Sequence, residues 1–333
     1  MLTPQGSPEQ ARDKLECAIR QGGWQTASLW RELVALMRED AHYLAIRQLW
    51  AAAPEKARAS SAIVRHVARA ACMTGHHDEG RAMLRPVIQA SGRQAAAIRF
   101  RRAYQGAKRR LSASGLSFGT SFKQKAEVAL RDLKEDLNRF GVQPFLISGT
   151  LLGHIRERGF IPWDKDIDVG IFAGRDELDA LETGVAAEGR FRVKRHDLRA
   201  NRLALHHHLG VAIDVFPHYP EGDIVWHDGA STRWWNSPFG LKSDIFLGIE
   251  QLIPDDPERY LEENYGDWRT PQAFFDSRLD APNVQVVDPE YLLSMHYFSL
   301  LNAVRAGNRR ATARYVGLIR PTDDGPWLRG LAG

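Results

Sequence analysis

Three aspartates alternate with other residues in the segment 164–168 of this 333-residue sequence. Asp164, Asp166 and Asp168 would project from one face of a β-strand, because successive side chains of a strand point to opposite faces. Neighbouring carboxylates would then lie about 6.6 Å apart along the strand. Like charges in this arrangement are destabilising unless a cation or a substrate compensates them, and such hard oxygen ligands suit Mg²⁺ or Mn²⁺. The spacing therefore predicts a metal-binding strand.

A calcium-binding EF-hand loop also begins with alternating acidic residues, and it is the main competing interpretation. That loop requires glycine at its sixth position and glutamate at its twelfth, where this sequence has Val169 and Arg175. The apolar alternation that continues to Phe172 also disfavours a solvent-exposed loop. A strand remains the better interpretation.

A fourth aspartate has a similar setting. Asp214 lies inside the apolar segment 211–216, and a carboxylate isolated in a buried strand is costly. Its cost would be offset beside a metal ion that Asp166 and Asp168 hold. We therefore expect these three carboxylates to form one metal-binding and catalytic set.

A turn upstream predicts a phosphate site. Ser148, Gly149 and Thr150 lie between a short apolar strand and a helix. A helix N-terminus presents unpaired N–H groups to an anion, and glycine lets a phosphate approach the backbone closely. Arg156 supplies a cation on the same helix.

The elements that must position these residues follow from the spacing of apolar residues. We expect an amphipathic helix over 121–140, a strand over 144–147, a helix from 148, a strand over 165–172 and a helix over 176–187. Three β-like segments follow, and the tail from Pro289 returns to helix; the β-like segments are 190–196, 202–208 and 211–217. This mixture predicts an α/β (α+β) domain with a mixed sheet and flanking helices.

The sequence pattern predicts only helices in the first third of the chain. Residues 26–39, 41–53, 60–73 and about 78–90 have helical apolar spacing. The segment 70–82 resembles the inter-helix region of a tetratricopeptide repeat, with an unrelated helical bundle as an equal alternative. The expected organisation is a helical, tetratricopeptide-like module over 1–112, a linker over 113–119, a catalytic domain over 120–285 and C-terminal helices over 286–333.

Bulk composition is that of a globular protein, with 44% hydrophobic and 26% charged residues and a net charge of +4. Two cysteines make no disulfide framework, and we recognise no signal peptide and no transmembrane segment. We expect a cytoplasmic protein, with peripheral attachment at the inner face of the membrane as one option, and no nucleic-acid partner.

The run from Ile147 to Gly170, ISGTLLGHIRERGFIPWDKDIDVG, closely resembles the signature of the LicD/fukutin family, whose members are similar in fold to nucleotidyltransferases. The segment 254–268, PDDPERYLEENYGDW, resembles the closing segment of that family. The resemblance covers about 120–272. Ser148 and Gly149 stand in the reverse of the usual order for the fold, and the cysteines that bind zinc in some eukaryotic relatives are absent.

The resemblance implies a transferase that moves a phospho-alditol or phosphocholine group to a glycan hydroxyl and releases CMP, in capsule or other cell-surface polysaccharide synthesis. The implied donor is CDP-ribitol, CDP-glycerol or CDP-choline, and the implied acceptor is a glycan or a lipid-linked saccharide. Asp166 and Asp168 would hold Mg²⁺, Asp214 would complete the metal site and take the proton of the attacking hydroxyl, and Asp164 would hold a metal-bound water or a donor hydroxyl.

Two alternatives stay open at this point. A nucleotidyltransferase of the same fold would add NMP to a small molecule or a protein. An interaction protein would use its N-terminal helices to bind a protein partner, with a degenerate catalytic domain. We further expect the segment 265–268 to pack the domain rather than contact substrate, and His206 and His208 to share one strand face near the cleft.

Overall fold

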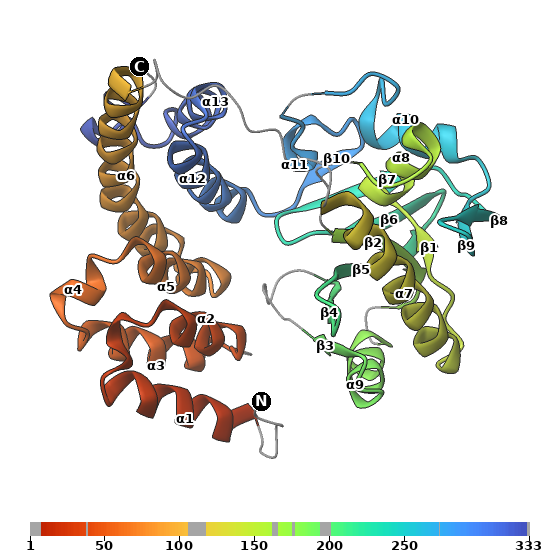
Figure 1. Ribbon diagram of the computed structural model, residues 1–333, viewed down its shortest axis with the longest axis horizontal. Helices are drawn as coiled ribbons and strands as arrows, with labels where there is room; N and C mark the ends of the chain where they lie inside the picture. Colours follow the sequence, from red (N-terminus) through yellow and green to blue (C-terminus); the bar gives the residue numbers. More distant parts are fainter. Residues whose placement is uncertain are drawn as a thin grey trace. The chain divides into compact units, whose positions relative to one another are not determined.

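The structure is a computed structural model that describes residues 8–37, 39–105, 118–161, 166–174, 177–193, 201–272 and 274–331. The chain divides into two compact units, Met1–Leu111 with Asp288–Gly333, and Ser112–Val287 (Figure 1). The expected linker falls on 113–117, outside the described residues, and on the first two residues of helix α7. The basic segment 99–110 lies outside the residues whose side chains are described.

The first unit is all helical in its described part. Its elements are α1 (Pro8–Arg20), η1 (Gly23–Gln25), α2 (Ala27–Ala35), α3 (Asp40–Ala51), α4 (Glu55–Arg58), α5 (Ser61–Met73), α6 (His77–Gln105), α12 (Pro289–Ala306), α13 (Arg309–Ile319) and η3 (Pro326–Leu328). Helix α6 packs against both α5 and α12, and α12 packs against α13. The C-terminal helices thus belong to the same unit as the N-terminal ones.

Helix α6 is longer than the sequence predicts. We expected it to end near residue 90, but it continues to Gln105 with Pro86 in its interior. Proline removes one backbone hydrogen bond from a helix. Helix α6 packs against both α5 and α12, and tertiary packing supplies most of the stability of a protein helix.

The second unit holds a mixed ten-stranded sheet with flanking helices, so the predicted fold class is confirmed. Its elements are α7 (Phe118–Arg139), β1 (Phe145–Leu146), α8 (Ser148–Glu157), β2 (Asp166–Phe172), α9 (Leu178–Ala187), β3 (Phe191–Val193), β4 (Leu203–His207), β5 (Ala212–Glu221), β6 (Ile224–Asp228), β7 (Thr232–Asn236), β8 (Leu241–Phe246), β9 (Ile249–Pro254), α10 (Pro257–Tyr265), α11 (Ser277–Asp280) and β10 (Val284–Val286). None of the helices built from described residues is long and apolar enough to cross a membrane.

The strand order is β10-β7-β6-β5-β2-β1-β9-β8, and β4 lies off this path between β5 and β3. Strands β2 and β5 are parallel neighbours near the middle of the sheet, and β1 runs antiparallel to β2. Gly170 allows β1 to approach, because a Cβ at this position would lie 2.5 Å from ring atoms of Phe145. The third β-like segment of the sequence, now β5, is the parallel neighbour of the predicted metal-binding strand, and the second, now β4, pairs with the other edge of β5.

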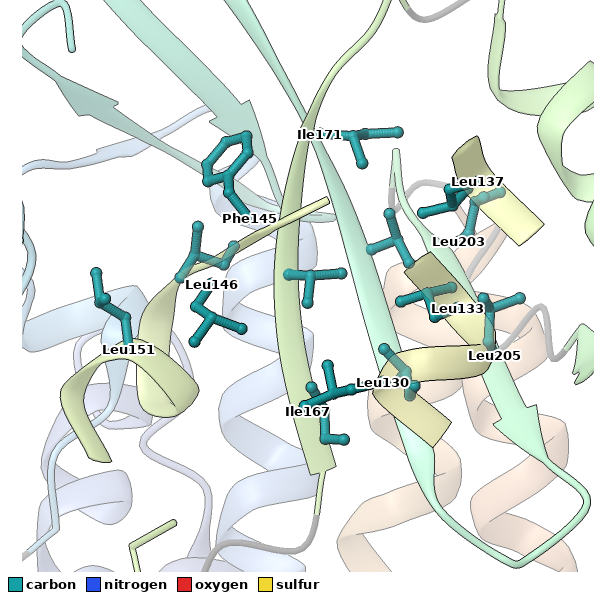
Figure 2. Packing of buried hydrophobic residues seen from close by; sticks show 14 of the residues in the cluster. Leu130, Leu133, Leu137, Phe145, Leu146, Leu151, Ile167, Ile171, Leu203 and Leu205 are labelled. Atoms are coloured by element: carbon teal, nitrogen blue, oxygen red, sulfur yellow. The ribbon is translucent and has the colours of Figure 1, made fainter. Parts of the chain in front are cut away.

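The core of this unit lies between the sheet and α7. Leu130, Leu133 and Leu137 follow one stripe of α7 and are buried with the apolar side chains of β2 and β4 (Figure 2). Ile167 on β2 and Leu205 on β4 belong to this cluster. Because strand side chains alternate, burying these residues turns the aspartates of β2 toward the other face.

Candidate active site

The sheet brings the predicted carboxylates of β2 and β5 together. Asp168 pairs in register with Asp214, and Asp166 pairs with Ala212. Residues opposite each other on neighbouring strands point to the same face of the sheet, and so do residues two apart on one strand. Asp166, Asp168 and Asp214 therefore share one face, with Asp166 exposed and the other two half-buried.

Among the described residues, both an opposite charge and a like charge act on the carboxyl group of Asp214. Burial raises the pKa of the Asp214 carboxyl, the guanidinium of Arg202 lowers it and the nearby carboxylate of Asp166 raises it. The Nε atom of Arg202 lies 3.4 Å from Oδ1 of Asp214. Arg202 shares the face of Asp214 because it lies two residues before Ala204, the register partner of Asp214 on β4. Within the described part of the chain, Arg202 thus offsets only part of the cost of burying the Asp214 carboxylate.

Helix α8 is joined directly to the carboxylate strand. The hydroxyl of Thr150 accepts a hydrogen bond of 2.9 Å from the backbone N–H of Asp168, and Thr150 is only 1% exposed. This hydroxyl therefore connects α8 to β2, and any phosphate contact at Thr150 falls to its backbone.

The turn into α8 is held in an unusual conformation. Ser148, the first residue of the helix, has φ of +48°. This left-handed conformation is unfavourable for a residue other than glycine, and such outliers are concentrated at functional sites. The sequence prediction for this turn concerned the close approach of a phosphate to Gly149 and did not foresee the left-handed conformation of Ser148.

Arg156 lies further along α8, at a cavity of about 160 Å³. Its Nη1 donates a hydrogen bond of 2.9 Å to the carbonyl oxygen of Trp268, and its Nε donates to Glu157. The cavity is bounded by Gly149 and Arg156 on α8 and by the segment from Tyr265 to Phe275. The predicted phosphate-binding residues thus lie beside a cavity whose opposite wall the sequence did not identify as a site.

Asp164, the secondary member of the predicted set, lies outside the described residues, as does Lys165. The same is true of Arg175, which served to exclude the calcium loop. The exclusion gains independent support from Val169, because it is buried within β2 rather than placed in a loop.

A second group of possible ligands lies on the opposite face of the sheet. One side-chain ligand atom from each of Asp132, His207 and His208 lies within 4.8 Å of the others. His207 is fully buried; its Nε2 lies 2.8 Å from Oδ2 of Asp132 on α7, and its Nδ1 accepts the N–H of Leu209 at 3.3 Å. The Nδ1 atom therefore carries no proton, and Nε2 donates its proton to Asp132.

This hydrogen-bond pattern favours a structural role for the group. A neutral histidine that binds a metal through Nε2 must carry its proton on Nδ1, where it would face the N–H of Leu209. Burial lowers the pKa of His207, which keeps the ring neutral. Sequence reasoning missed this contact because Asp132 is 75 residues away from His207 along the chain.

The chemistry of the carboxylate face fits a hard divalent cation. Asp166, Asp168 and Asp214 offer oxygen ligands only, from two adjacent strands, and oxygen donors suit Mg²⁺ and Mn²⁺. The raised pKa of Asp214 expresses the cost of burying this charge without full compensation. A bound cation would remove that cost.

Comparison with known proteins identifies the part of the chain that carries these features. Residues 141–245 match the family described as LicD/FKTN/FKRP, nucleotidyltransferase domain. This segment contains α8, β2 and β5, and lies inside the range 120–272 over which the resemblance was expected, so that expectation is confirmed.

Several curated relatives share about 30% identity with the chain. The ribitol-5-phosphate transferase FKTN of Mus musculus is 31% identical over 175 residues, which are 49% of this chain and 37% of that protein. The lipopolysaccharide cholinephosphotransferase LicD of Haemophilus influenzae is 29% identical over 122 residues, which are 36% of this chain and 39% of that protein. The matches thus span well under half the length of these relatives.

Proposed function

We propose that this chain, whose residues 141–245 match the family described as LicD/FKTN/FKRP, nucleotidyltransferase domain, transfers a phosphate-containing group from a CDP-linked donor to a hydroxyl of a glycan and releases CMP. The observation that carries the proposal is the register of β2 and β5, which places Asp166, Asp168 and Asp214 on one face next to the N-terminus of α8. Carboxylates beside a phosphate-binding helix are suited to phosphoryl transfer.

In this proposal Asp166, Asp168 and Asp214 hold one or two Mg²⁺ ions. Bound Mg²⁺ would supply charge neutralisation for the donor pyrophosphate and for the leaving phosphate. Asp214 accepts the proton of the attacking hydroxyl, a general-base role that a carboxylate can fill. The backbone N–H groups of Ser148, Gly149 and Thr150 bind a donor phosphate, and Arg156 adds a positive charge.

The nature of the transferred group is proposed from the relatives. Two relatives are named as ribitol 5-phosphate transferases and a third as a cholinephosphotransferase. We therefore propose CDP-ribitol, CDP-glycerol or CDP-choline as donor and a cell-surface glycan or a lipid-linked saccharide as acceptor. Asp164 would bind a metal-bound water or a donor hydroxyl, and the N-terminal helices would recruit the acceptor or a protein partner.

The test is a screen of the three CDP-linked donors for CMP release by the full chain in the presence of Mg²⁺, with and without a chelator. Asp166→Asn and Asp168→Asn are each expected to lower transfer by roughly a thousandfold, about 4 kcal/mol of transition-state stabilisation, because each removes a ligand charge. Their circular dichroism and unfolding curves should stay close to those of the unsubstituted chain.

Asp223→Asn is the matched control, since Asp223 is an exposed aspartate of the turn between β5 and β6. It should leave transfer unchanged. Undiminished turnover in Asp166→Asn or Asp168→Asn would disprove the assignment of these residues. Incorporation of NMP into an acceptor, with no CMP release, would replace the proposed reaction by nucleotidyl transfer.

A further inference from the structure

Arg202 lies beside the predicted carboxylates, although the sequence pattern did not identify it as a site residue. It directly precedes β4, and its guanidinium carbon lies 5.6 Å from the centroid of the Phe216 ring on β5. Its Nε atom lies 3.4 Å from Oδ1 of Asp214. An aromatic ring and a carboxylate thus hold this arginine on the face of the sheet that carries Asp166 and Asp168.

The nitrogen atoms of the Arg202 guanidinium differ in their surroundings. Nε is buried and lies within ion-pair distance of Asp214, but it makes no hydrogen bond to a described residue. Nη1 and Nη2 have no hydrogen-bond partner among the described residues either, and 27% of the side chain is exposed. Arginine presents its terminal N–H groups as a planar fork that matches the oxygens of a phosphate. These groups are therefore free to bind an anion on the carboxylate face.

Arg156, the arginine that the sequence predicted as a phosphate ligand, already binds protein groups. Its Nη1 donates to the carbonyl oxygen of Trp268 and its Nε donates to Glu157. Arg156 also lines the cavity beside α8, whereas Arg202 contacts the carboxylate that we propose as the general base. Arg202 is therefore better placed than Arg156 to contact a phosphorus centre that reacts beside Asp214.

We propose that Arg202 is a further catalytic residue, whose terminal N–H groups donate to the non-bridging oxygens of the phosphoryl group that is transferred. The inference rests on the proposed function for the presence of a donor with a diphosphate. The acceptor oxygen bonds to the distal phosphorus of the donor, and CMP leaves with the electrons of the broken bond between this phosphorus and the bridging oxygen. Asp214 takes the hydroxyl proton. Arg202 supplies no atom; it holds positive charge beside the oxygens that carry negative charge in the transition state.

The position of Arg202 has a second consequence, for the binding of a cation. A guanidinium 3.4 Å from Asp214 repels a divalent cation that shares this carboxylate and competes with it for Oδ1. Removal of Arg202 should therefore weaken the binding of phosphate groups and strengthen the binding of the cation alone. A residue that only maintains the fold of β4 and β5 would not produce opposite changes in these two affinities.

The experiment measures two affinities of the full chain by calorimetry, one for inorganic pyrophosphate at saturating Mg²⁺ and one for Mg²⁺ alone. Arg202→Met should weaken pyrophosphate binding by about tenfold or more, the size expected for a hydrogen bond to a charged group. It should strengthen Mg²⁺ binding by about threefold, as expected for the loss of one partly exposed ion pair. The kcat for CMP release should fall by roughly a hundredfold, the effect of removing one donor to a transition-state oxygen.

Two further variants separate charge, geometry and fold. Arg202→Lys keeps the charge but loses the planar fork, so its Mg²⁺ affinity should stay unchanged and its pyrophosphate affinity should be intermediate. Arg233→Met is the matched control, because Arg233 also forms an ion pair of 3.4 Å, with Glu221, and lies over an aromatic ring, that of Trp226. It lies on the opposite face of the sheet, since its neighbour Trp234 shares the carboxylate face through the register of β5, β6 and β7. It should change neither affinity.

A pyrophosphate affinity of Arg202→Met equal to that of Arg233→Met would overturn the inference, and so would weaker Mg²⁺ binding in Arg202→Met or no pyrophosphate binding by the unsubstituted chain. If Arg202→Met does not fold, an unchanged pyrophosphate affinity in Arg202→Lys overturns the inference instead. If CMP release occurs and does not depend on Arg202, the inference fails and the proposed function stands. If both affinities change as expected but no CDP-linked donor releases CMP, the phosphate contact of Arg202 stands and the proposed function fails.

Discussion

At the scale of single residues, Thr150 joins the two parts of the candidate site. Its hydroxyl is the acceptor for the backbone N–H of Asp168, so the first turn of α8 is hydrogen-bonded to the strand that carries the carboxylates. Thr150 is buried, so water does not replace this bond. The position therefore requires a hydroxyl rather than merely a β-branched side chain.

We predict that Thr150→Val destabilises the chain by about 1–3 kcal/mol, because it leaves a buried N–H without an acceptor. Transfer should fall as well, since Asp168 loses its anchor. Thr150→Ser preserves the hydroxyl and should retain more of both stability and transfer. Denaturant unfolding and CMP release measure the two effects. A Thr150→Val chain as stable as Thr150→Ser would contradict this role.

At the scale of elements, α7 is fastened to the strands of the sheet by a group of charges. Arg190, which immediately precedes β3, contacts Asp132 at 3.1 Å, Glu135 at 2.7 Å and Asp136 at 2.9 Å. Asp136 is fully buried, and burial raises the pKa of its carboxyl while Arg190 lowers it. Arg190 is therefore the main cation that makes this buried charge tolerable, and Arg139 contributes less.

We predict that Arg190→Met lowers the free energy of unfolding by about 3 kcal/mol at pH 7, because it removes the main cation that compensates the charge of Asp136. The pKa of Asp136 in the folded variant rises further above its unfolded value of 3.8. A carboxyl with a raised folded pKa binds protons more readily in the folded state, so the relative stability of the variant should recover as the pH falls through that pKa.

Arg131→Met is the control for this prediction, since Arg131 forms an exposed pair with Glu127 on the same helix. It should change stability by less than about 1 kcal/mol at either pH. Unfolding curves at pH 7 and pH 5 test both variants. A deficit in Arg190→Met that is equal at the two pH values would show that Asp136 is not its cause.

Local sequence patterns predicted some elements of this unit and missed others. Strand parity predicted that Asp166 and Asp168 share a face, and the apolar run around Asp214 predicted a second strand; both are local patterns. The pairing of His207 with Asp132 and the cavity wall at Trp268 arise from contacts between distant segments. The sequence placed no strands over 224–254, where four strands of the sheet lie, because their pairing is set by the tertiary structure.

At the scale of the whole molecule, the chain forms one unit from its two ends and the other from its middle. The candidate site lies entirely in the unit Ser112–Val287. A substitution that destabilises only the helical unit, Met1–Leu111 with Asp288–Gly333, should therefore lower the stability of that unit without changing nucleotide binding. Substitution of Gly80 on α6 is suited to this test. A Cβ at this position would lie 2.8 Å from the backbone carbonyl oxygen of Ala68 on α5, and the backbone of α5 cannot shift as easily as the end of a flexible side chain.

We predict that Gly80→Ala lowers the thermal unfolding midpoint of the helical unit, since overpacking against α5 costs about 1–3 kcal/mol and exceeds the gain of about 1 kcal/mol in helix propensity. Gly317 in α13 has no atom within 4 Å of its Cβ position, so Gly317→Ala should stabilise the same unit through propensity alone. Calorimetric unfolding and CMP titration measure the outcome. A Gly80→Ala chain that gains stability as Gly317→Ala does would show that α5 and α6 are not packed at this distance. A loss of CMP affinity in Gly80→Ala would show that nucleotide binding depends on the helical unit.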